Sequence, residues 1–328
     1  MANTSLKNKI LSLSPHIEML VRHIYWKNIS LFSRLSVSKP SKSVKSEFDD
    51  LDYDDIARFL ESSGVAKGSL LVVHSAYSSL KGRGKNHNEI LDFFIDIIGG
   101  EGTLAMPAMP KFSNAVVKDK YLTSDSHVTE IFEYDSEKSG VATGVLPLML
   151  TKRTNAIRSR FPINTMVALG PLSEELFRDE FNHPSPLACG IGSSWKKCLD
   201  NDALIIGFGT DLTHSLTSIH VAEDSWEDAW AVSGWYHEKK FRIIDGDASK
   251  IIPIRERVPK WGALHYAERT LCKDLLDAGI LKSRTFNGVV VEVTSAKKLN
   301  DFLIDQQQKK KEFSTKSQKN IFHIIHEL

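Results

Sequence analysis

The stretch LLVVHSAYSSLKGRGKNHNEILDFFIDIIGGEGTLAMP, residues 70–107, decides the fold that we expect for this chain. It opens with the apolar run Leu70–His74, which is typical of a short strand buried on both faces. A helical segment follows at Asn88–Ile98, and Thr103–Met106 predicts a second buried strand that ends at Pro107. A strand, a helix and another strand in this order predict a parallel βαβ unit.

The same alternation of apolar runs and helical segments continues on both sides of this unit. Helices are predicted at Asp54–Ser63, His214–Trp226, Ala263–Ala278 and Ala296–Gln308, and strands at Ala203–Gly207 and Val289–Val293. Two short runs, Arg242–Ile244 and Ile251–Ile254, flank a turn and predict an added β-hairpin. The sequence therefore predicts an α/β fold with a central, mainly parallel sheet, helices on both faces and a small added β-hairpin.

Composition and charge argue against several classes of protein. The formal net charge is +1, so no overall field attracts nucleic acid, and no nucleic-acid partner is expected. The cysteines Cys189, Cys198 and Cys272 are too scattered for a disulfide framework or a zinc site, so we expect no metal. No apolar run is long enough to span a membrane and no signal-peptide pattern opens the chain, so we expect a cytoplasmic protein.

The two ends of the chain are basic. Up to residue 45 the only acid is Glu18, and apolar residues recur there at helical spacing, namely Leu13, Ile17, Leu20, Val21 and Ile24. We expect an amphipathic helix that packs on the body of the protein or on the second subunit of a homodimer. Contact with an anionic membrane surface is the alternative. The predicted organisation is a basic N-terminal helical arm and linker (1–47), an α/β domain (48–308) and a basic C-terminal tail (309–328).

Motifs of three large enzyme classes are absent from the sequence. There is no G-x-S-x-G motif, no G-x-x-x-x-G-K-[ST] motif, and no G-x-G-x-x-G motif after a predicted strand. These absences argue against a serine enzyme of the α/β-hydrolase class, a P-loop nucleotide hydrolase and a dinucleotide oxidoreductase.

Polar residues follow the first buried strand, at the sheet edge where open α/β sheets bind ligands. His74 and Ser75 end this strand, Ser79 follows, and Lys81–Lys85 (KGRGK) leads into the next helix. Exposed backbone N–H groups, a helix start and three cations suit a ligand that bears phosphate. A solvated surface loop is the alternative interpretation.

A second candidate site lies in GFGTDLTHSLTSIHVAEDSWEDAW, residues 207–230. His220 and Glu223 are three residues apart on a predicted helix, so their side chains share one face. A carboxylate beside an imidazole fixes the tautomer of the ring and raises its basicity, as general-base chemistry requires. Acidic residues around the pair, Asp224 among them, could hold the ammonium groups of an amino sugar. An ordinary acidic helix with a packed histidine is the alternative.

Seven motifs occur in order along the middle of the chain. They are VHS and SL within 73–80, GEGTLAMP (100–107), GVLP (144–147), RSRFPINTMVALG (158–170), GIGS (190–193), GFG (207–209) and SLTSIHVAE (215–223). In this order they resemble the aminoglycoside 3-N-acetyltransferase family. The resemblance implies that family's α/β fold for the 48–308 domain.

The resemblance also implies an activity and a donor site. The family consists of acyltransferases that move an acetyl group from acetyl-CoA, a co-substrate, to an amine of an aminoglycoside, which confers antibiotic resistance without a metal. By the same resemblance, His74, Ser75 and Ser79 would contact the CoA arm, and Thr165 would lie near the thioester. The acceptor expected here is an aminoglycoside or another amino sugar.

The resemblance places the acceptor site at the second candidate segment. His220 and Glu223 match the family pair that lines the amino-sugar site. We expect Asp211 and Asp224 to hold the sugar.

One departure concerns the catalytic base. The family motif reads R-S-x-H-P, and its histidine is the expected base, but this chain has Phe161 at that position. A phenyl ring cannot accept a proton. Two replacements are open, His220 oriented by Glu223, or His183 in the loop between two of the motifs.

Two further functions remain open at this point. A sugar-nucleotide N-acyltransferase of surface polysaccharide biosynthesis fits the near-neutral charge, because a polycationic antibiotic would favour a strongly acidic enzyme. A non-catalytic binding homologue fits the loss of the histidine at Phe161.

Overall fold

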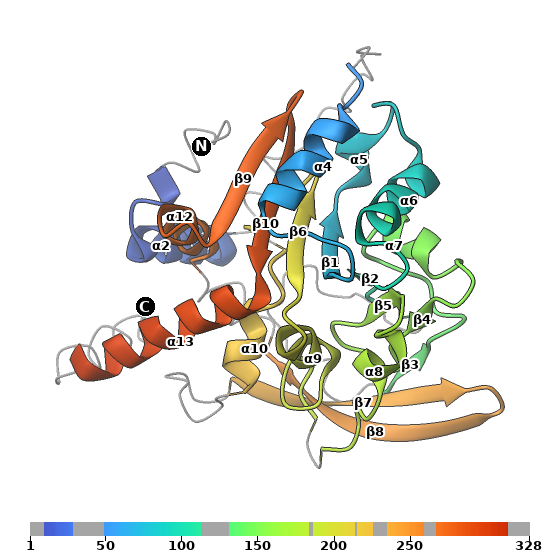
Figure 1. Ribbon diagram of the computed structural model, residues 1–328. Coiled ribbons are helices and arrows are strands. Elements are labelled where there is room, and N and C mark those ends of the chain that lie inside the picture. Colours follow the sequence, from blue (N-terminus) through green and yellow to red (C-terminus); the bar gives the residue numbers. More distant parts are fainter. Residues whose placement is uncertain are drawn as a thin grey trace.

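The computed structural model describes residues 10–28, 49–112, 131–183, 186–213, 215–225, 235–258 and 267–313 (Figure 1). Residues 29–48, which include the predicted linker, lie outside these ranges. Residues 314–328 of the predicted tail do so as well. The predicted division of the chain at residues 47 and 308 stays a prediction.

A seven-stranded sheet forms the centre of the molecule, in the order β4-β5-β2-β1-β6-β10-β9. The strands are β1 (Leu70–Ser75), β2 (Thr103–Pro107), β4 (Ile157–Arg158), β5 (Met166–Leu169), β6 (Leu204–Phe208), β9 (Leu281–Phe286) and β10 (Val289–Ser295). Strands β2, β1 and β6 run parallel, whereas β5, β4, β10 and β9 join the sheet through antiparallel pairs. The parallel strands that the sequence predicted therefore form the centre of the sheet, and antiparallel strands flank them on both sides.

Helices cover both faces of this sheet, as predicted (Figure 1). On one face lie α4 (Tyr53–Ser62), α5 (Tyr77–Leu80), α6 (His87–Ile98) and α7 (Val145–Leu150); on the other lie α8 (Ser173–Phe177), α9 (Ser194–Asp200), α10 (Ile219–Asp224), α12 (Glu268–Asp277) and α13 (Ala296–Phe313). Alternate residues of β1 enter the two cores: Leu71 and Val73 enter one, Leu70 and Val72 the other. Burial on both faces explains why β1 is apolar throughout.

The helix predicted at His214–Trp226 is shorter in the structure, where α10 has six residues, Ile219–Asp224. The residues before it form turns, and the Ser215 hydroxyl donates to the carbonyl oxygen of Asp211 at 3.1 Å. Serine and threonine side chains compete in this way with helical backbone bonds, which explains the late start of the helix.

A second sheet has three strands in the order β3-β7-β8. The predicted β-hairpin is present and longer than expected, with β7 (Tyr236–Asp245) and β8 (Ala248–Arg257) paired along their full length. The short strand β3 (Ile131–Asp135), which the sequence pattern did not predict, lies parallel to β7. The hairpin crosses beneath α9 and α10 in Figure 1.

The N-terminal helix α2 (Pro15–Lys27) packs beside α12 (Figure 1). Its polar residue Glu18 is fully buried, while its apolar residues face outward, with Leu20 at 59% and Ile24 at 50% exposure. The apolar side of the predicted amphipathic helix is therefore not the side that contacts the body of this chain. None of the helices in the described part of the chain is both long and apolar enough to cross a membrane.

Candidate active site

A side-chain hydrogen bond connects the segments that follow the carboxyl ends of β1 and β6. The Ser79 hydroxyl donates to the carbonyl oxygens of Ala76 at 2.7 Å and of Gly209 at 2.5 Å. Gly209 has a φ of 72°, and a Cβ there would collide with the Ser79 hydroxyl oxygen, so only glycine fits. These bonds give Ser79 a structural role, and its predicted contact with the CoA arm stays a prediction.

The predicted pair on α10 is formed. Nδ1 of His220 lies 2.6 Å from Oε2 of Glu223, and the Glu223 side chain is 8% exposed. Arg257, from β8, places its Nη1 3.0 Å from the same carboxylate oxygen. The Arg257 guanidinium thus holds the buried Glu223 carboxylate in a fixed orientation toward the imidazole.

Asp224, the next residue on α10, connects three parts of the structure. Its carboxylate accepts from the backbone N–H of Cys189 at 3.0 Å and from the Tyr236 hydroxyl at 2.8 Å, and Arg257 lies 3.5 Å away. Burial raises the pKa of Asp224, and the neighbouring Arg257 opposes that rise. Asp224 therefore joins α10 to the β-hairpin and to the preceding loop.

Two cavities flank His220. The larger one, about 250 Å³, is lined by Ile163, Asn164, Leu187, Ala188, His220, Asp224, Arg255, Glu256, Arg257, Val258 and Glu268. The smaller one, about 60 Å³, is lined by Thr213, Ser215, Leu216, Thr217, Ile219, His220, Glu268, Leu271 and Cys272. Two residues, His220 and Glu268, line both. Charged groups and an imidazole on a shared wall suit a substrate with charged and hydroxyl groups.

Phe161, at the position where the resembling motif has a histidine, lies inside the core. Phe161 is 4% exposed, and its ring centroid lies 5.4 Å from that of Phe181. Nearby, the Ser159 hydroxyl contacts both carboxylate oxygens of buried Glu180, at 2.9 and 2.7 Å. Burial raises the pKa of Glu180 to about 7, and the hydrogen bond from Ser159 opposes the rise. Phe161 itself can only pack.

Thr165 and His74 are both buried in the structure. The Thr165 hydroxyl donates to the carbonyl oxygen of Phe161 at 2.6 Å, so its predicted place near the thioester stays a prediction. His74 stacks on Trp195 with 6.0 Å between ring centroids, and burial lowers the pKa of His74 to about 4. The Trp195 indole N–H donates to the carbonyl oxygen of Asn164, which lines the larger cavity. A chain of contacts thus links the end of β1 to that cavity.

The other predicted site residues lie outside the two cavities. Asp211 is exposed and accepts from the backbone N–H of Thr213 at 3.2 Å. His183 is exposed, and Ser75 is half-buried at the end of β1. The structure therefore brings together His220, Glu223 and Asp224 but not these residues, whose predicted roles stay predictions.

The phosphate-binding loop predicted at Lys81–Lys85 meets a helix start that is already capped. Oδ1 of Asn86 accepts from the backbone N–H groups of Asn88 and Glu89, at 2.9 and 3.2 Å. These are the groups that would otherwise bind an anion. In the conformation described, the helix start therefore does not offer these two N–H groups to a phosphate.

Sequence reasoning missed three charged residues around His220, namely Arg255, Arg257 and Glu268. All three come from segments after residue 250, and none of them belongs to a motif that the sequence analysis identified. Within the described ranges, no group of three or more His, Cys, Asp and Glu side chains could hold a metal ion.

Comparison with known proteins supports the resemblance seen in the motifs. The model of the aminoglycoside 3-N-acetyltransferase family matches residues 72–308. Aminoglycoside N(3)-acetyltransferase IX of Micromonospora chalcea is 27% identical over 245 residues, which are 67% of this chain and 80% of that protein.

Solved structures of acetyltransferases share the fold. One is AAC-IIIb in a binary complex with CoASH (TM-score 0.65, 20% identity, 79% of this chain and 96% of that chain). Another is a mutant of aminoglycoside acetyltransferase AAC(3)-IVa in complex with a gentamicin (TM-score 0.60, 17% identity, 82% of this chain and 91% of that chain). The family match covers most of the chain, and the predicted family and fold are confirmed. The chain belongs to the aminoglycoside 3-N-acetyltransferase family and is an acyltransferase.

Proposed function

We propose that this enzyme transfers an acetyl group from acetyl-CoA to an amine of an aminoglycoside or amino sugar, with His220 as the general base. The observation that carries the choice of base is the pair of His220 and Glu223, 2.6 Å apart, on the wall of two cavities. Family membership supports the reaction, and the solved AAC-IIIb complex with CoASH supports the donor. Acetyl-CoA is consumed as a co-substrate, and the reaction needs no metal.

The reaction requires a neutral amine. Its nitrogen attacks the thioester carbonyl carbon, the carbon–sulfur bond breaks, and CoA leaves as a thiolate that then takes a proton. The proton released by the amine passes to the imidazole of His220. With Nδ1 donating to Glu223, Nε2 is the basic nitrogen and the developing imidazolium is stabilised by a buried carboxylate. A positioned base of this kind contributes about 10²–10⁴ to the rate.

A sugar nucleotide is the second candidate acceptor. Arg255 and Arg257 line the larger cavity together with three carboxylates, so its charge is mixed rather than strongly acidic. Arginine is the side chain best suited to a phosphate group, and the net charge of +1 offers no field to attract a polycation. This reaction would belong to surface polysaccharide biosynthesis and would use the same base.

One experiment separates these functions from a non-catalytic binding homologue. Release of free CoA thiol from acetyl-CoA is measured with gentamicin, glucosamine and a uridine-diphosphate amino sugar as acceptors. Turnover that depends on one of these amines supports the transferase and identifies the acceptor class. Saturable acetyl-CoA binding without turnover on any amine would support the binding homologue, which Phe161 alone favours.

We further propose that the outward side of α2 contacts a second copy of this chain in a homodimer. Exposed apolar residues at this N-terminal helix and the turn before it include Leu13 at 71% and Leu20 at 59%. A membrane surface is the less favoured partner, because Arg22 on this helix contacts Glu268 rather than solvent. The cysteines Cys189, Cys198 and Cys272 are buried free thiols, which supports a reducing compartment such as the cytoplasm.

A further inference from the structure

Glu268, the first residue of α12, lies on the wall that the two cavities share with His220. Its side chain is 23% exposed. The other carboxylates of the larger cavity are held by the β-hairpin: Asp224 contacts Tyr236, and Glu256 contacts Lys239 at 2.6 Å. Glu268 borders the cavity from a different element, the start of α12.

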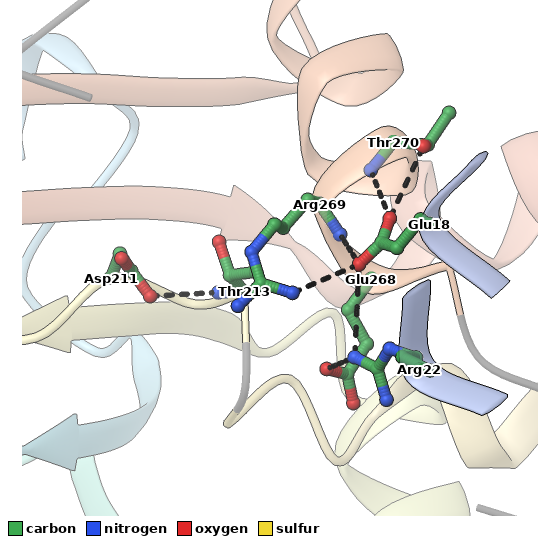
Figure 2. Close-up of polar contacts among 7 residues, drawn as sticks. All are labelled: Glu18, Arg22, Asp211, Thr213, Glu268, Arg269 and Thr270. Atoms are coloured by element: carbon green, nitrogen blue, oxygen red, sulfur yellow. Dashed lines mark hydrogen bonds and ion pairs between the residues drawn. The ribbon is translucent and has the colours of Figure 1, made fainter. Parts of the chain in front are cut away.

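One contact of Glu268 comes from the N-terminal helix α2. Nη2 of Arg22 lies 2.5 Å from Oε2 of Glu268, although 246 residues separate the two in the sequence (Figure 2). Arg22 stands outside residues 72–308, the part of the chain that the family model matches. A residue beyond the family-matched segment thus fixes a carboxylate in the candidate site.

Helix α2 is itself anchored at the same place. The fully buried carboxylate of Glu18 accepts from the backbone N–H groups of Arg269 at 3.2 Å and Thr270 at 3.1 Å (Figure 2). The Thr270 hydroxyl adds a third bond at 3.2 Å. The N-cap residue of α12, Ala267, has no side chain that could cap the helix. Glu18 supplies the cap that α12 lacks, and this fixes Arg22 relative to Glu268.

A carboxylate in this setting suits a cationic ligand. Arg22 restricts the Glu268 side chain, so less conformational entropy is lost when a ligand binds. An alkylammonium group beside a partly buried carboxylate forms a charge-assisted hydrogen bond, about twice as strong as a neutral one. The reacting amine must be neutral, so an ammonium group bound by Glu268 would be a second amine of the same acceptor.

We propose that Glu268 is a specificity-determining residue of the acceptor site. Its carboxylate recognises an ammonium group of the acceptor that is distinct from the reacting amine. Arg22 of α2 is a positioning residue that acts through Glu268. Through Arg22, the N-terminal helix α2 thereby contributes to acceptor binding. This inference rests on the proposed acetylation of an amino sugar.

The test compares kcat and KM for gentamicin, which carries several amines, and for glucosamine, which carries one. Glu268→Gln is expected to raise the KM for gentamicin about tenfold, the effect of one lost ionic contact. Its KM for glucosamine and for acetyl-CoA should stay within about twofold, as should kcat. Arg22→Gln should raise the KM for gentamicin in the same direction, and Arg22→Lys, which keeps the charge, should restore most of it.

Arg58→Gln is the matched control, because Arg58 pairs with Asp55 on the surface of α4, which packs on the opposite face of the sheet from α10, and Arg58 lines neither cavity. This variant should leave all constants unchanged. A loss of packing alone would alter kcat or affect both acceptors alike. An unchanged KM for gentamicin in Glu268→Gln, or an equal rise for both acceptors, overturns the proposal.

Activity of the wild-type enzyme tests the proposed function separately from the role of Glu268. If the wild type acetylates no amine, calorimetric titration with gentamicin tests Glu268 directly. Binding about tenfold weaker in Glu268→Gln than in the wild type would still support the recognition role. Equal binding by the two proteins, or no binding by the wild type, overturns it.

Discussion

The carboxylate of Glu18 accepts a hydrogen bond from the backbone N–H of Thr270, 3.1 Å away and 252 residues later in the chain. The contact closes the N-terminus of α12 with a side chain from α2, and both groups are buried (Figure 2). An N-terminal segment outside the family match is in this way bound to the α/β body of the protein.

Loss of this contact should destabilise the protein. Glu18→Gln removes the charge from a fully buried carboxylate that Arg269 and the start of α12 surround, so the free energy of unfolding should fall by about 1–3 kcal/mol. Urea unfolding followed by circular dichroism measures the change. Asp301→Asn, which breaks an exposed ion pair with Lys297, should change it by less than about 0.5 kcal/mol. Equal effects of the two substitutions would show that the buried cap contributes nothing.

The identity of the base can be tested by comparing two histidines. His220→Ala should lower kcat by about 100-fold, because the proton acceptor is lost, and Glu223→Gln should lower it at least about tenfold. His183→Ala should leave kcat within about twofold, since His183 is exposed and lines neither cavity. Thermal unfolding of each variant provides the control for folding. A large loss in His183→Ala with full activity in His220→Ala would transfer the role to His183.

Stability should depend on pH through Glu180. Burial raises the pKa of Glu180 from 4.5 to about 7, so between these values the folded state binds more protons than the unfolded state. The free energy of unfolding should therefore fall as the pH rises from 4.5 to 7, by an amount on the order of 1–3 kcal/mol from this group.

The variant Glu180→Gln isolates that contribution. It removes the titrating group, so the difference in stability between variant and wild type should shift in favour of the variant as the pH rises across this window. Urea titrations at about pH 5 and about pH 8, on either side of the raised pKa, measure the two differences. A constant difference would mean that Glu180 is ionised throughout.

The exposed side of α2 should control the oligomeric state. Leu20→Asp combined with Ile24→Asp places charge on the apolar side, so a homodimer that uses this surface should dissociate. Light scattering during size-exclusion chromatography gives the mass. Sedimentation with anionic liposomes at low salt tests the membrane alternative. Binding by the wild type that is lost in the doubly substituted variant would support it. A monomeric wild type that leaves the liposomes in solution would refute both partners.

Much of the fold could be read from local periodicity. The apolar runs at 70–74, 103–106 and 203–207 became the parallel core of the sheet, because strands buried on both faces must be apolar throughout. The two-residue strand β4 and the short strand β3 gave no signal of their own. The antiparallel direction of β10 against β6 could not be read either, since periodicity carries no direction.

The candidate site divides in the same way. The contact between His220 and Glu223 followed from a spacing of three residues, which places two side chains on one helical face whatever surrounds the helix. Arg257, Glu268 and Arg22 reach the same place from β8, α12 and α2, and no local pattern predicted them.

By itself, the sequence determined the family, the parallel core and the pair on α10, because each depends on residues close together in the chain. Only the tertiary structure decided which side of α2 faces the protein and which charges surround His220. The reason is physical. A buried carboxylate such as Glu18 must find hydrogen-bond donors, and its donors belong to a helix that only the packing of the whole chain brings near.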